Sequence, residues 1–148
     1  MAHEALKAAC AGKDTYQQVA SSAWAIRALA ERGRNKKAAE AVPALVSLSA
    51  EISPPVSRLT ALFLLWQSVW PLDRTVRLQV LNPLVSACQT TVSWQAGYTL
   101  RDVVRMLASE DPGEARRILE QMPEGKHKRQ AQRQLEGGQT MTPRSFFW

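Results

Sequence analysis

Cysteine, histidine and glycine are scarce in this 148-residue chain, with two, two and seven copies. Cys10 and Cys88 lie far apart and form no Cys-x-x-Cys pair, so neither a disulfide framework nor a zinc or redox motif is indicated. The glycines form no phosphate-binding loop, and no serine lies in a Gly-x-Ser-x-Gly context. We therefore expect no cofactor, no metal and no catalytic activity.

The few groups with possible acid–base chemistry have plainer interpretations. Two histidines without an acidic cluster give no metal site, and we expect both His3 and His127 to be solvated surface side chains. Asp102 would be a general base only if it were buried. We expect it instead to pair with Arg101 or Arg105 on a helix surface.

Long hydrophobic runs are also missing. The longest, Ala61 to Leu65, is far too short to span a membrane. Residues 1–13 mix charges with small residues and have no apolar stretch, so we expect no signal peptide and a cytoplasmic location. Hydrophobic residues make up 45% and charged residues 22%, which is typical of a folded globular chain of one domain.

Positive charge is in excess, with a formal net charge of +6 and a sequence pI near 9.8. This balance favours anionic partners, such as nucleic acid, an acidic protein face or a membrane surface. The alternative is a basic surface that is merely solvated.

Helical patterns fill the chain, and no strand pattern competes with them. We expect an all-α fold of about seven helices, with residues 1–138 as one helical-repeat domain and 139–148 as an aromatic tail. Gly97 lies inside an expected helix, where it costs about 1 kcal/mol relative to alanine, and we expect it to mark close helix packing. The expected helical ranges are 15–32, 36–52, 55–70, 74–90, 93–109, 114–122 and 126–135, preceded by a short segment at 2–11.

Three prolines, Pro43, Pro83 and Pro123, lie 40 residues apart. A basic residue lies six positions before each of them. A fixed period of about 40 residues is typical of two-helix repeats that stack into a solenoid. We expect Pro43 and Pro83 to lie inside equivalent helices and to bend them.

The segments Val42 to Leu48 and Pro54 to Leu62 resemble a HEAT-type repeat, in which a short turn joins a proline-bearing first helix to a second helix. Leu81 to Val85 resembles the first half again, and residues 111–135 resemble either a short tetratricopeptide-like hairpin or a generic bacterial helical hairpin. The resemblance implies a right-handed α–α superhelix of about three helical hairpins. It also implies a module that binds macromolecules.

Basic residues near the repeat positions are the main binding candidates. If the repeats stack, these side chains form a ladder along one edge, at the helix spacing of roughly 8–10 Å. Such a row would follow a nucleic-acid backbone or an acidic protein strip. Its alternative is solvated surface charge. The members of this basic ladder are Arg34, Lys36, Lys37, Arg74, Arg77, Arg116 and Arg117.

The aromatic residues fall into two groups. Trp24, Trp66, Trp70 and Trp94 follow apolar stripes, so we expect them in the core. The tail ends in Phe146, Phe147 and Trp148. We expect these three to dock in an apolar groove of this chain or of a second copy, which makes self-association through the tail an open possibility.

The expected function is a non-catalytic helical-repeat module whose partner is a protein, with an acidic face matching the basic ladder. The alternative is a nucleic-acid-binding solenoid that uses the same ladder. Partner identity and oligomeric state stay open.

Overall fold

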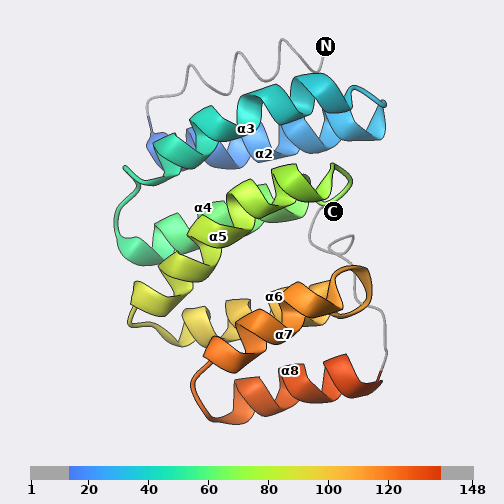
Figure 1. Cartoon of the computed structure of the whole chain (residues 1–148). Helices are drawn as coiled ribbons and strands as arrows, with labels where there is room; N and C mark the ends of the chain where they lie inside the picture. The colour runs from blue at the N-terminus through green and yellow to red at the C-terminus, as the bar shows by residue number, and fades with distance from the viewer. Residues whose placement is uncertain (1–13, 138–148) are drawn as a thin grey trace. The chain divides into compact units, whose positions relative to one another are not determined.

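The structure is a computed structural model that describes residues 14–137, and within that range it is all-helical with no strand (Figure 1). The expected all-α fold is confirmed, and each helix end lies within three residues of its predicted position. The segment at 2–11, and with it Cys10 and His3, lies outside the described residues. The helices are α2 (Thr15–Glu31), α3 (Asn35–Ser49), α4 (Pro55–Ser68), α5 (Arg74–Thr90), α6 (Trp94–Glu110), α7 (Pro112–Gln121) and α8 (Lys126–Gly137).

Side-chain caps fix where several helices begin. The Asp14 carboxylate accepts a hydrogen bond from the Tyr16 amide at 2.8 Å, and Ser93 accepts one from Gln95 at 3.2 Å. Each cap satisfies a backbone N–H that has no partner inside its helix. Asp111 accepts a hydrogen bond from the Glu114 amide at 3.4 Å at the start of α7. The first residue of α4 and of α7 is a proline, whose missing N–H costs nothing in a first turn.

The chain divides into two compact units between Ala87 and Cys88. In the first unit α2 packs against both α3 and α4, and in the second unit α6 packs against both α7 and α8. Each unit therefore pairs a helix with the next helix and with the next but one, as two-helix repeats do. The superhelix handedness stays a prediction.

The helices pair into hairpins differently from what the resemblance implies. The resemblance grouped α3 with α4 and α7 with α8, but α3–α4 and α7–α8 are the smaller contacts. The hairpins are α2–α3 and α6–α7. The reason is the width of the buried stripes, because α3 buries one narrow stripe whereas α2 buries residues over a wide arc. A helix with a wide stripe holds two neighbours, and a helix with a narrow stripe holds one.

Two of the four tryptophans expected in the core are not there. Trp66 is fully buried and Trp70 partly buried, but Trp24 is 45% exposed and Trp94 is 71% exposed. Trp24 lies on the side of α2 opposite the buried stripe. Trp94 is the first residue of α6, and the buried positions of that helix begin at Ala96.

The 40-residue period has a spatial counterpart in the first unit. A groove of about 520 Å³ lies between α3 and α5, and its walls include Lys36 with Val76 and Ala39 with Gln79, two pairs that are each 40 residues apart. α3 and α5 are therefore equivalent neighbours within this unit.

Only two of the three prolines lie at equivalent positions inside helices. Pro43 and Pro83 lie inside α3 and α5, as expected, but Pro123 lies in the connection after α7. The third copy departs because α7 has 10 residues whereas α5 has 17. A helix that short ends before it reaches the repeat position of the proline.

The exposed Pro43 supplies a stability test. Its ring removes one hydrogen bond inside α3, so we expect Pro43→Ala to raise the free energy of unfolding by about 1–3 kcal/mol, after allowing for the greater freedom of the unfolded chain. Urea unfolding followed by circular dichroism measures this. The matched control is Pro112→Ala at the first turn of α7, where no hydrogen bond is missing and no comparable gain is expected. An equal gain at both positions would contradict this account of α3.

Candidate binding surface

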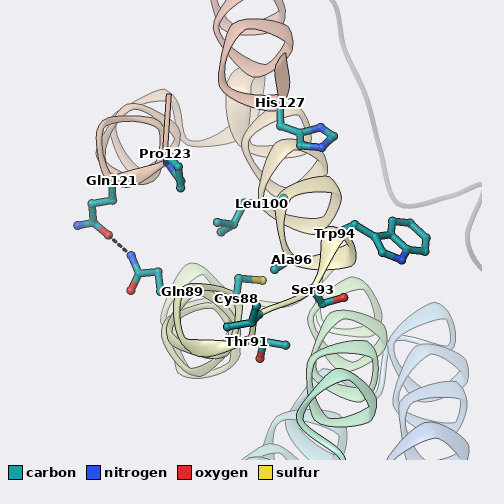
Figure 2. A pocket seen from close by; sticks show the side chains of 12 residues that line it. Cys88, Gln89, Thr91, Ser93, Trp94, Ala96, Leu100, Gln121, Pro123 and His127 are labelled. Carbon is teal, nitrogen blue, oxygen red and sulfur yellow. Dashed lines mark hydrogen bonds between the residues drawn. The ribbon is translucent and has the colours of Figure 1, made fainter. Parts of the chain in front are cut away.

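A pocket of about 620 Å³ opens in the second unit (Figure 2). Six segments form its wall: the end of α5, the 91–93 connection, the first half of α6, the end of α7, the connection that follows it and the start of α8. The Gln89 side-chain amide donates a hydrogen bond to the Gln121 side-chain oxygen at 3.0 Å, which ties α5 to α7 at the rim. The lining residues are Cys88, Gln89, Thr91, Val92, Ser93, Trp94, Ala96, Gly97, Leu100, Gln121, Pro123 and His127.

The pocket lining carries no formal charge at neutral pH. It contains no lysine, arginine, aspartate or glutamate. Burial raises the pKa of the Cys88 thiol to about 12, so this group stays protonated. Burial lowers the pKa of His127, and the nearby charges of Arg101 and Lys126 lower it further. The imidazole is therefore neutral at pH 7.

Exposed apolar side chains border this pocket. Val92 is fully exposed, Trp94 is 71% exposed and Tyr98 is 39% exposed. The Trp94 ring meets the Tyr98 ring edge to face, with centroids 5.4 Å apart, and Figure 2 shows the indole projecting from the start of α6. We call Val92, Trp94 and Tyr98 the aromatic rim. Neighbouring exposed apolar groups of this kind mark interaction sites more often than bare surface.

His127 is not the solvated surface histidine that the sequence predicts. Its ring packs against Tyr98 with centroids 4.4 Å apart, and its Nδ1 is buried with no hydrogen-bond partner among residues 14–137. The approach depends on Gly97, because a Cβ at that position would lie 2.7 Å from Cδ2 of His127. Gly97 therefore marks close packing of α6 against α8, as expected.

Arg101 connects the aromatic rim to α8. Its guanidinium lies 4.7 Å from the centroid of the Tyr98 ring, forms an ion pair with Asp102 at 2.8 Å and donates a hydrogen bond to Gln130 at 3.2 Å. Asp102 also reaches Arg105 at 3.6 Å. The prediction that Asp102 pairs with these two arginines is confirmed.

The basic ladder is only partly a set of exposed cations. In the first unit Arg34, Lys36, Lys37 and Arg74 are exposed, but Arg77 is half-buried, with its guanidinium 5.5 Å from the centroid of the Trp70 ring. The groove between α3 and α5 brings Lys36 together with Glu40 and Asp73, so its charges are mixed.

In the second unit Arg116 and Arg117 are exposed. Arg117 forms an ion pair with Glu114, and this hydrogen-bonded contact raises the pKa of the arginine. A continuous ladder through both units stays a prediction. So does the docking of Phe146, Phe147 and Trp148, which lie outside the described residues.

Sequence reasoning missed the pocket. Ser93 could be recognised as a cap residue, but that pattern gives the start of α6 and not the exposure of its neighbours Val92 and Trp94. Gly97 indicated a close helix contact, but nothing in the sequence identified His127, thirty residues further on, as the partner.

No protein family, curated protein or solved structure was found to match this chain. Among residues 14–137, no three histidine, cysteine or acidic side chains are placed to hold a metal ion. In the same part of the chain no helix has the length and apolar character needed to cross a membrane.

The contact between Gly97 and His127 can be measured by a double-mutant cycle. We expect Gly97→Ala to lower the free energy of unfolding by about 1–3 kcal/mol, because the new methyl group collides with the imidazole. In a His127→Ala background the same change should instead raise stability by about 0.5–1 kcal/mol, the ordinary helix gain of alanine over glycine. If Gly97→Ala has the same sign in both backgrounds, the ring is not what excludes a side chain.

The lowered pKa of His127 predicts a pH dependence. Below the ordinary imidazole value of about 6.5 the unfolded chain binds a proton that the folded chain resists, so stability falls as the pH drops through this range. We expect unfolding free energies at pH 7.5 and 5.5 to differ more in the native chain than in His127→Gln. Parallel pH profiles would show that His127 titrates normally in the folded state.

Proposed function

We propose that the chain is a non-catalytic helical module that binds another protein through the pocket and the aromatic rim of its second unit. The observation that carries the proposal is an uncharged pocket of about 620 Å³ beside a tryptophan that is 71% exposed. Protein interfaces concentrate their binding energy in aromatic side chains and in the pockets that receive them.

The chemistry of the lining supports binding over catalysis. A nucleophilic cysteine needs a lowered pKa, whereas Cys88 has one near 12. The lining contains no carboxylate, so His127 has no acidic partner within the pocket to orient it as a base. What the pocket offers is apolar surface with amide and hydroxyl groups at its edge, which suits an inserted side chain.

Binding of nucleic acid through the basic ladder is the second candidate. Arg34, Lys36 and Lys37 support it, since all three are exposed within four residues at the start of α3. Two other members of the basic ladder are less available to a phosphate group, because Arg77 lies over Trp70 and Arg117 is paired with Glu114. The cytoplasmic location inferred from the sequence accompanies both candidates as a prediction.

Photocrosslinking from the pocket edge tests the proposal. The photoreactive amino acid p-benzoylphenylalanine replaces Val92, whose side chain is fully exposed, and the matched control carries it at the exposed Ala44 of α3. In cells of the source organism we expect position 92, but not position 44, to capture a protein of defined mass. Adding Trp94→Ala should reduce the yield roughly tenfold, as loss of an interface hot spot does.

Two results would contradict the proposal. A crosslink at position 92 that nuclease removes would favour nucleic acid, and equal capture from positions 92 and 44 would show that the aromatic rim is ordinary surface. Circular dichroism of each variant confirms that the fold is retained.

A further inference from the structure

A row of exposed cations lies on α8, the helix whose start lines the pocket. Lys126, Arg129 and Arg133 are spaced three and four residues apart, so they share one side of α8. All three are exposed, and none forms an ion pair with another residue in the described part of the chain. We call them the α8 stripe.

Along the chain, the α8 stripe begins one residue before the last residue that lines the pocket. Lys126 precedes His127, which lines the pocket, and it is close enough to lower the pKa of that histidine. The buried positions Ala131 and Gln134 occupy another side of α8, which leaves the stripe open. From Lys126 to Arg133 the helix rises about 10 Å, a length that three or four residues of extended chain would span.

The contacts of the aromatic rim disfavour a nucleic-acid strand as the ligand here. Bases bind such surfaces by stacking on open ring faces. Arg101 lies over the Tyr98 ring, and His127 packs against the same side chain. The pocket itself offers no cation to a phosphate. Its uncharged lining suits an inserted apolar side chain, and the cations lie outside it.

We infer that the partner presents an extended acidic segment with one aromatic side chain, which enters the pocket while the acidic residues pair with the α8 stripe. The inference rests on the proposed function and names the chemistry of its partner. Charge complementarity also separates this ligand from the chain's own tail, because residues 138–148 contain Arg144 and no acidic residue.

Selection from a random dodecapeptide display library, run on the full chain, tests the inference. We expect the selected peptides to be enriched in an aromatic residue followed or preceded within about six positions by aspartate or glutamate. Lys126→Glu/Arg129→Glu/Arg133→Glu should abolish the acidic enrichment and weaken a selected peptide roughly tenfold or more in fluorescence anisotropy. Trp94→Ala should instead reduce the aromatic enrichment.

The matched control reverses the same number of charges elsewhere. Arg34→Glu/Lys36→Glu/Lys37→Glu changes the net charge equally but lies in the first unit, so peptide selection should be unchanged. Peptides with no charge preference, basic peptides, no enrichment at all, or an equal loss in this control would each overturn the inference. So would displacement of the selected peptide by a twelve-nucleotide uridine strand more readily than by an unlabelled copy of that peptide.

Failure of the inference and failure of the proposed function are distinguishable. With the photoreactive group at position 92, the α8 reversal should remove the crosslinked protein. If the variant with reversed α8 charges captures that protein in the same yield, the module binds a protein, but the partner has no acidic segment against the α8 stripe. If position 92 captures no protein even in the native background, the proposed function fails as well.

Discussion

Burial of α2 and of α6 on two sides is the constraint on which both units depend. Each of these helices carries an apolar stripe wide enough to receive the next helix and the next but one. A helix held on two sides cannot rotate without exposing part of one contact. The remaining open side of α6 is therefore fixed in direction, which places Trp94 and Tyr98 outward and Leu100 in the pocket wall. The binding surface follows from the way that this helix is packed.

Helix positions were predictable from the sequence, because proline, glycine and cap residues act locally. Asp14, Ser93 and Asp111 each precede a helix and each accept a backbone hydrogen bond at its start. Pairing of helices was less predictable, since it depends on the angular width of stripes that face one another. The narrow stripe of α3 selects α2 as its partner, and the order of elements along the chain does not reveal that choice.

The candidate surface was harder to predict, and particular residues show why. The spacing of Trp24 places it opposite the buried side of α2, so its exposure could have been read from the sequence. The pocket, by contrast, needs the end of α5, α7 and α8 to meet around α6, and burial there raises the pKa of Cys88 and lowers that of His127. Neither property is encoded in any local pattern. The spacing of the basic ladder could be read from the sequence, but the contacts that Arg77 and Arg117 make with Trp70 and Glu114 could not.

The close fit between Gly97 and His127 also bears on how this protein can change over evolutionary time. In a lineage that keeps the imidazole, any side chain at position 97 carries a cost in stability, because its Cβ would lie 2.7 Å from the ring. A lineage that replaces the histidine with a small side chain is released from that restriction, and alanine then becomes the better helix residue there. The two positions should therefore covary in related sequences, and such a pair would identify distant relatives even where the aromatic rim has diverged.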